Sequence, residues 1–430
     1  MKTILRRLSQ RPSLRNVAVL ASGTAAAQAI TVAISPVLTR LYTPAEFGIF
    51  GVFMAVAAII VTIAALNYEL AVIIAHDEEE ANDVTALCLL ILVGTTLISW
   101  IVLLLIGDWL AAKLGSPAAT AFLQLVPLFV LIGGLVNIGY AWANRAKFYG
   151  AISIGAMWRS IGAASFQVLS GLLGAGPLGL IIGHTFGSAV QQTALLWTLR
   201  RQRIGLIRRM LNFDNLRRVA RSHSRFPKYN VPVMLLITVS KHFPSMFLAG
   251  FFSPAAAGLY WFTMRLLEMP SNLIGEAVRR VCYQRSAELH RGGGDVVAFW
   301  QKVTIGMLAL ASVPAAVIIL FAPALFALFF GAEWREAGHY AQWLVIWWAA
   351  SFTRIPSSAL SPVYGLQRSI LVIESFAFVC RAGAILLAAI VGEAMTAIVL
   401  YSIVGLVRDL VEIVYVRIKI SPRHSTAPGT

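Results

Sequence analysis

The chain has 430 residues, of which 58% are hydrophobic and only 13% are charged. A soluble protein of this length would carry about a quarter charged residues, so the composition excludes a soluble globular protein. Apolar runs of about 20 residues recur along the chain, and each is long enough to cross the hydrocarbon core of a bilayer. The sequence therefore predicts an all-α integral membrane protein.

The formal net charge of +16 raises the question of a nucleic-acid partner. The basic stretches lack the interleaved aromatic residues of a base-stacking surface, and Lys and Arg concentrate on the cytoplasmic loops of membrane proteins. We therefore expect no nucleic-acid partner. Three cysteines, Cys88, Cys282 and Cys380, lie in or at the end of apolar helices without paired spacing, which predicts neither a disulfide nor a metal site.

The apolar runs predict twelve transmembrane helices. They lie at residues 17–38, 46–74, 84–106, 119–140, 151–172, 177–199, 230–251, 257–281, 298–322, 337–360, 368–391 and 395–416. The basic N-terminus before the first run resembles a signal peptide. That run is too long for a cleaved segment, however, which favours a retained first span.

The basic residues between spans predict the orientation. If the chain starts in the cytoplasm, the cytoplasmic connections carry nearly all Lys and Arg, and the opposite face carries only Arg40, Lys113 and Arg335. We therefore expect a multi-pass protein of the cell inner (cytoplasmic) membrane with both termini cytoplasmic. The segment 76–83 is expected to be an acidic cytoplasmic loop, which disfavours the major-facilitator transporters that usually have a basic motif there.

An Arg-rich stretch divides the chain into two halves of six spans each. The predicted parts are an N-terminal lobe at 1–199, a basic cytoplasmic linker at 200–229, a C-terminal lobe at 230–416 and a cytoplasmic tail at 417–430. Six spans return the chain to the same side, so the two lobes run parallel. The linker is expected to lie on anionic lipids, with substrate contact as the alternative.

A short repeat supports this duplication. Residues 38–50 and 248–260 both contain a Thr or Ser, then Pro-Ala, then two residues and a Gly, between two apolar runs. Thr43 and Ser253 are expected to cap the following helix, with Pro44 and Pro254 at its first position. Gly48 and Gly258 are expected to allow close helix approach.

Two glycine-rich stretches need separate interpretation. Residues 174–179 match G-x-G-x-x-G, but they join two apolar spans with no strand before them, which indicates a turn instead of a dinucleotide site. Residues 292–294 are expected to form a loop. No nucleotide-binding P-loop sequence is present, so the chain is not expected to hydrolyse nucleotides.

Ionisable residues inside spans carry the functional prediction, because each costs several kcal/mol when it faces lipid. Arg265 and Glu268 share a helix face, as do Glu374 and Arg381. A structural ion pair or a packed histidine is the alternative for each residue, and Arg408 with Glu412 is the best structural case. The predicted cationic cavity comprises Lys241, Arg265, Arg381, Arg354, Arg159 and His242, and the candidates for ion coupling are Glu69, Glu268, Glu374 and His184.

The deep bases outnumber the deep acids in this set. Such a cavity suits an anionic ligand, above all one with phosphate, which Arg binds in bidentate fashion. Lys241 is notable because it lies near mid-depth in a span that contains no acid.

Three stretches resemble the Wzx-like oligosaccharide flippases, in the polysaccharide biosynthesis branch of the multidrug/oligosaccharidyl-lipid/polysaccharide (MOP) exporter superfamily. They are residues 38–50, residues 67–74 with their acidic continuation, and residues 225–284. Within the last stretch the resemblance rests on 225–232, 252–260, 265–270 and 274–278.

The resemblance implies a flippase that moves polyprenyl-pyrophosphate-linked oligosaccharides across the cytoplasmic membrane by alternating access between two lobes arranged in a V. It implies no cofactor, an H⁺ or Na⁺ gradient as energy source, and the polysaccharide polymerase machinery as a further partner. A multidrug exporter of the MATE type is the alternative. A membrane polymerase or ligase of lipid-linked sugars is less favoured, because the outer loops are short and nearly free of charge.

Overall fold

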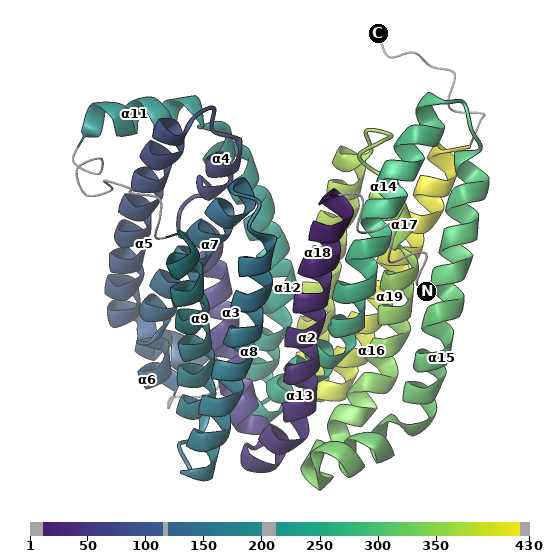
Figure 1. The fold of residues 1–430 in the computed structure, drawn as a ribbon. Helices are drawn as coiled ribbons and strands as arrows, with labels where there is room; N and C mark the ends of the chain where they lie inside the picture. Colours follow the sequence, from purple (N-terminus) through teal and green to yellow (C-terminus); the bar gives the residue numbers. More distant parts are fainter. Residues whose placement is uncertain (1–11, 115–118, 200–211, 422–430) are drawn as a thin grey trace. The chain divides into compact units, whose positions relative to one another are not determined.

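The computed structural model describes residues 12–114, 119–199 and 212–421, which are helical with short connections (Figure 1). The basic residues before Pro12, residues 200–211 of the linker and the end of the tail lie outside the described residues. The twelve predicted spans all fall on largely helical chain, but the second, fourth and tenth are each divided between two helices. Six described helical segments are long and apolar enough to cross a membrane: Pro44–Ile63, Glu78–Lys113, Thr120–Arg145, Phe226–Phe251, Val296–Phe330 and Gln367–Val391.

Contacts divide the chain into two compact units, Met1–Gly258 and Leu259–Thr430. The helix α12 (Val231–Phe251) groups with the first unit, although the sequence places it in the C-terminal lobe. The predicted lobes at 1–199 and 230–416 stay a prediction.

In the first unit α8 packs against both α2 and α9, α3 against α12, and α7 against α5 and α9. Its helices are α2 (Pro12–Leu41), α3 (Pro44–Ile63), α4 (Glu69–Ile74), α5 (Glu78–Lys113), α6 (Ala119–Leu123), α7 (Val126–Arg145), α8 (Tyr149–Leu172), α9 (Pro177–Leu199), α11 (Phe213–Ser222), the π-helical turn η1 (Phe226–Asn230), α12 and the first turn of α13 (Pro254–Pro270).

In the second unit α16 packs against α15 and α19, and α18 packs against α19. This unit contains the rest of α13, the π-helical turn η2 (Ser271–Gly275), α14 (Glu276–Arg291), α15 (Val296–Phe330), the 3₁₀ turn η3 (Ala332–Trp334), α16 (Arg335–Thr353), α17 (Ile355–Leu360), α18 (Gln367–Val391) and α19 (Ala394–Lys419). Both π-helical turns lie in the stretch 225–284, and such turns are frequent at functional sites.

The repeated segments have the predicted local structure. The Thr43 hydroxyl accepts a hydrogen bond from the Glu46 amide, and the Glu46 carboxylate accepts one from the Thr43 amide, which completes a capping box. The Ser253 hydroxyl accepts from the Ala256 amide at 3.1 Å. Pro44 and Pro254 are the first residues of α3 and α13, where a missing N–H costs nothing.

The two copies of the repeat also pack against each other. A Cβ on Gly48 would lie 1.7 Å from the carbonyl oxygen of Pro254, and a Cβ on Gly258 would lie 1.9 Å from that of Pro44. The contact is therefore reciprocal, and it brings backbone against backbone. Only glycine at both positions permits an approach this close.

Three predicted boundaries were wrong. The second span is interrupted between α3 and α4, where Leu66 and Asn67 have φ of 51° and 58°. The tenth span breaks at Arg354 because Pro356 lies in the first turn of α17 and lacks an amide hydrogen. The acidic segment 76–83 is mostly helix: α5 begins at Glu78, and the Asp77 carboxylate caps it by accepting from the Glu80 amide at 2.7 Å. Acidic residues in a first turn are stabilised by the helix dipole.

The glycine-rich stretches are connections, as predicted. Gly174 and Gly176 have φ of 69° and 57° between α8 and α9, and Gly293 has φ of 66° between α14 and α15. No strand precedes residues 174–179, since α8 leads directly into them. The interpretation of G-x-G-x-x-G as an interhelical turn is confirmed.

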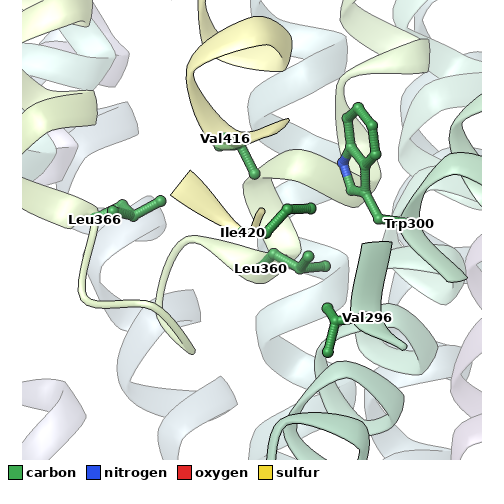
Figure 2. Close-up of a cluster of buried hydrophobic side chains, with 6 residues drawn as sticks. All are labelled: Val296, Trp300, Leu360, Leu366, Val416 and Ile420. Carbon is green, nitrogen blue, oxygen red and sulfur yellow. The ribbon is translucent and has the colours of Figure 1, made fainter. Parts of the chain in front are cut away.

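A buried apolar cluster joins α15, α17 and α19 in the second unit (Figure 2). Val296, Trp300, Leu360, Leu366, Val416 and Ile420 form it. The Trp300 indole N–H donates to the Ser357 hydroxyl at 3.0 Å, so this large side chain is buried without losing a hydrogen bond. The cluster holds α17 and the end of α19 together.

Candidate functional site

A network of acidic and basic side chains lies inside the second unit. It joins the break between α16 and α17 to α18 and α19, which Figure 1 labels. The members are Arg354 at the break, Glu374 and Arg381 on α18, and Arg408, Asp409 and Glu412 on α19.

Two arginines on different elements share the acids of α19. Arg354 Nε lies 2.7 Å from Asp409 Oδ1, and Arg354 Nη1 lies 3.2 Å from Glu412 Oε2. Arg408 Nη1 lies 2.7 Å from Asp409 Oδ1, and Arg408 Nη2 lies 2.6 Å from Glu412 Oε2. Asp409 also accepts hydrogen bonds from the Trp347 indole and the Ser351 hydroxyl. The predicted Arg408–Glu412 ion pair is confirmed.

Glu374 bridges the remaining two guanidinium groups. Its Oε1 lies 3.1 Å from Arg381 Nη1, and its Oε2 lies 2.7 Å from Arg408 Nε. Glu374 and Arg381 therefore meet on one face of α18, as their two-turn spacing predicts.

The network contains three arginines and three carboxylates, so its formal charge is zero. The side chains of Arg381, Arg408, Asp409 and Glu412 are at most 6% exposed, whereas those of Glu374 and Arg354 are 24% and 25% exposed. Buried charges persist only when paired, and removal of one partner from such a group costs about 3–5 kcal/mol. The network is thus formally neutral and mostly buried, and Glu374 and Arg354 are its partly exposed members.

Arg381 has a second kind of partner. Its guanidinium lies over the ring of Trp347 at 5.3 Å and near the ring of Tyr401 at 5.8 Å. Within the described part of the chain, Glu374 is the one acid at ion-pair distance from Arg381. The assignment of Arg354 and Arg381 to substrate binding stays a prediction. In the structure Arg354 is paired with Asp409 and Glu412, and Arg381 is paired with Glu374.

The other predicted residues of the second unit lie on α13. Arg265 lies over the Trp261 ring at 5.0 Å, one turn further along the helix. Glu268 follows it at the i+3 position of the same helix. Their roles in substrate binding and ion coupling are untested.

The bases predicted in the first unit are on α8 and α12. Lys241 is exposed and His242 is half-buried on α12, which is tied to α3 by a 3.0 Å hydrogen bond between the Thr62 and Thr238 hydroxyls. Arg159 on α8 is half-buried, and its Nε is buried without a hydrogen-bond partner among the described residues. The predicted substrate-binding roles of these residues stay predictions.

His184 on α9 packs between two aromatic rings. Its ring is 5.8 Å from Phe50 in an edge-on arrangement and 5.6 Å from Phe129 in a stacked one. This is the packing environment that the sequence left open as the alternative to ion coupling.

Glu69 begins α4 directly after the break in the second span. Its Oε2 is buried without a hydrogen-bond partner in the described structure, and so is Nδ2 of Asn67. Arg145 on α7 donates to the carbonyls of Val72 and Ala75 at 3.0 and 2.7 Å and so stabilises the other end of α4. A buried carboxyl oxygen without a donor is costly, and such groups occur at functional positions.

Sequence reasoning missed Asp409 and the aromatic residues around Arg381. The available signal was an Arg-Asp pair followed by Glu412 inside a predicted span, where ionised residues are rare and face the bundle interior. The i, i+4 spacing predicted the pair Arg408–Glu412, but Asp409, which lies between them in the sequence, was not included in the prediction.

The profile of the family described as "Polysaccharide biosynthesis protein" matches residues 37–339, which is more than half of the chain. The chain belongs to this family. No curated protein sequence matches it significantly.

Solved structures show the fold of this family member. An inward-facing MATE multidrug transporter of the MOP superfamily superposes with a TM-score of 0.71 at 15% identity, covering 97% of this chain and 100% of that one. The lipid II flippase MurJ, in an inward closed conformation, gives a TM-score of 0.72 at 10% identity over 94% and 89% of the two chains. A MOP superfamily transporter from Pyrococcus furiosus gives 0.60 at 14% identity, over 96% of each chain.

The chain is thus a multi-pass membrane protein of the polysaccharide biosynthesis family, and its fold is that of the solved MOP superfamily transporters. The resemblance to the Wzx-like branch is thereby confirmed at the level of family and fold. The membrane polymerase or ligase of lipid-linked sugars stays the less favoured alternative.

Proposed function

We propose that the protein is a flippase that moves polyprenyl-pyrophosphate-linked oligosaccharide repeat units across the cell inner membrane, with both termini in the cytoplasm. The observation that carries the proposal is family membership over residues 37–339, in a chain whose fold resembles that of a lipid II flippase. Lipid II flipping is the activity of that solved protein and is not assigned to this chain. Here the substrate is inferred from the polysaccharide family and from the basic residues within the spans.

The bases supply the chemistry that a pyrophosphate requires. Lys241 is exposed on α12, and its ammonium attracts phosphate as a point charge. Arg159, Arg265, Arg354 and Arg381 offer planar guanidinium groups that bind phosphate oxygens in pairs. In the proposed mechanism these residues and His242 contribute to a cationic cavity that opens alternately to each side, while the lipid tail stays in the bilayer.

An H⁺ or Na⁺ gradient is the proposed energy source. Glu69, Glu268, Glu374 and His184 remain the coupling candidates, and Glu69 is favoured because its buried carboxyl oxygen lacks a donor in the described structure. A proton bound to that oxygen would remove the cost of a buried unpaired charge.

Two further partners are proposed. The outer face of α11 is basic, with Arg217 and Arg221 exposed one turn apart and Phe213 exposed one turn before them. Such a face suits the anionic lipids of the cytoplasmic leaflet, at about 1 kcal/mol per basic residue near the surface. The polysaccharide polymerase machinery would receive the flipped repeat unit on the outer face.

The deciding experiment is complementation of a strain that lacks this gene. The full chain should restore surface polysaccharide, and Lys241→Ala and Arg381→Ala should not, at unchanged protein level in the membrane. Arg285→Ala on the exposed part of α14 is the matched control, because it removes the same type of charge outside the spans. Normal export by both variants would refute the assignment of these residues.

A multidrug exporter of the MATE type is the second candidate, favoured by the similar fold of the inward-facing transporter. Drug accumulation in an exporter-deficient strain separates the two functions. Drug resistance conferred by the chain, without restored polysaccharide in the deletion strain, would favour the exporter.

A further inference from the structure

Glu374 occupies the position that an anionic ligand would take in the second unit. Its two carboxylate oxygens contact different arginines, Arg381 Nη1 at 3.1 Å and Arg408 Nε at 2.7 Å. A phosphate group carries negative charge on several oxygens and bridges guanidinium groups in the same manner. The protein's own carboxylate is thus held as a bound phosphate would be.

The two arginines depend on Glu374 to different degrees. Arg408 also contacts Asp409 at 2.7 Å and Glu412 at 2.6 Å, so it keeps two acids if Glu374 leaves. Arg381 keeps aromatic neighbours, including the rings of Trp347 and Tyr401, but no second acid at ion-pair distance among the described residues. Without Glu374 the network would hold three arginines against two carboxylates, and the surplus positive charge would fall on Arg381.

The exposures fit a carboxylate that covers a buried base. The Glu374 side chain is 24% exposed, whereas Arg381 and Arg408 are each 6% exposed beneath it. Glu374 and Arg354, at 24% and 25% exposed, are therefore the members that a ligand reaches first, and the departure of Glu374 would uncover Arg381. Asp409 and Glu412, at 2% and 0% exposed, are too deeply buried to exchange in this way.

We propose that Glu374 is an internal counter-ion that neutralises Arg381 in the empty transporter and is displaced by a phosphate of the substrate. The inference rests on the proposed flippase function for the nature of that phosphate. The exchange keeps Arg381 paired throughout, which avoids the cost of a buried unpaired charge in either state. It also makes Glu374 a competitor that sets how tightly an anion is held.

Pyrophosphate binding to the purified full chain in nanodiscs tests this competition. Glu374→Gln keeps the shape of the side chain and removes its charge, and we expect it to bind inorganic pyrophosphate at least tenfold more tightly than the wild type. Glu393→Gln, which makes the same change in net charge at an exposed position before α19, should bind like the wild type. Arg381→Gln added to Glu374→Gln should abolish the gain.

Equal affinities of Glu374→Gln and Glu393→Gln would overturn the inference, and so would a gain that survives the loss of Arg381. If Glu374→Gln does not fold, Glu374→Asp takes its place, because the shorter carboxylate cannot bridge both arginines and should also bind pyrophosphate more tightly. Unchanged binding by Glu374→Asp would then overturn the inference.

A prenylated probe distinguishes this inference from the proposed function. A larger gain for farnesyl pyrophosphate than for inorganic pyrophosphate would support the counter-ion role with a lipid-linked ligand. An equal gain for both would support the counter-ion role for a free phosphate. Loss of the flippase function in the complementation assay would leave either binding result intact, so the two failures remain separable.

Discussion

Replacement of Gly48 by alanine tests whether the contact between the two copies of the repeat is essential. The added Cβ would lie 1.7 Å from the carbonyl oxygen of Pro254 and 2.6 Å from its carbonyl carbon. Contacts below 3.0 Å essentially never occur for a Cβ, and the atoms in the way belong to the backbone of α13. No side-chain rotation relieves the clash, so α3 and the first turn of α13 must separate.

The expected cost lies at the upper end of the range for overpacking, about 3 kcal/mol. At about 2 °C per kcal/mol for a large folding unit, the apparent Tm in detergent should fall by roughly 6 °C. Gly258→Ala should behave alike, because its Cβ would lie 1.9 Å from the carbonyl oxygen of Pro44. Since either substitution already forces the helices apart, the double variant should cost less than the sum of the two.

The matched control is Gly94→Ala on α5, where an added Cβ meets no atom within 4 Å. Alanine has the higher helix propensity, so this variant should keep or slightly raise the Tm. Purified protein measured by tryptophan fluorescence during heating gives all four values. A Gly48→Ala variant as stable as Gly94→Ala would refute the claim that the two copies are pressed together at this point.

Three further outcomes are expected. Asp409→Asn should lower the unfolding free energy by about 3 kcal/mol, because Arg354 and Arg408 lose one of the two acids that they share. Thermal denaturation measures this, and an unchanged Tm would contradict the network. The double variant Arg217→Gln, Arg221→Gln should weaken stabilisation by anionic lipid by about 2 kcal/mol. The measurement is the Tm in nanodiscs with and without phosphatidylglycerol. Equal lipid stabilisation of the variant and the wild type would argue against lipid contact at α11. Glu69→Gln should keep the fold and remove the pH dependence of polysaccharide export by washed cells; a retained pH dependence would exclude Glu69 as the coupling group.

Local rules predicted the helices and their ends well. The caps at Thr43 and Ser253 and the turn at residues 174–179 appeared as expected, because each depends on residues within a few positions along the chain. The breaks at Asn67 and Arg354 were missed. An apolar run long enough to cross the bilayer looks the same whether or not tertiary contacts interrupt it.

The charged site was predictable only in part. The pair Glu374–Arg381 follows from helix periodicity, as does Arg408–Glu412, since each pair shares one helix face. The contacts of Arg354 with α19 do not follow, because no local rule relates the orientation of a helix break to a distant helix. Counting bases against acids therefore missed that folding brings Asp409 and Glu412 to Arg354 and Arg408, which makes this network formally neutral.

The sequence by itself determined the membrane class, the twelve helical segments, the family and the glycines of the repeat. Hydrophobicity, helix periodicity and capping depend on residues within one to five helical turns of each other, so they can be predicted from the sequence alone. Only the tertiary structure decided that Gly48 meets Gly258 and that Glu374 shields Arg381. Both depend on which helix faces come together, and packing at a distance selects those faces.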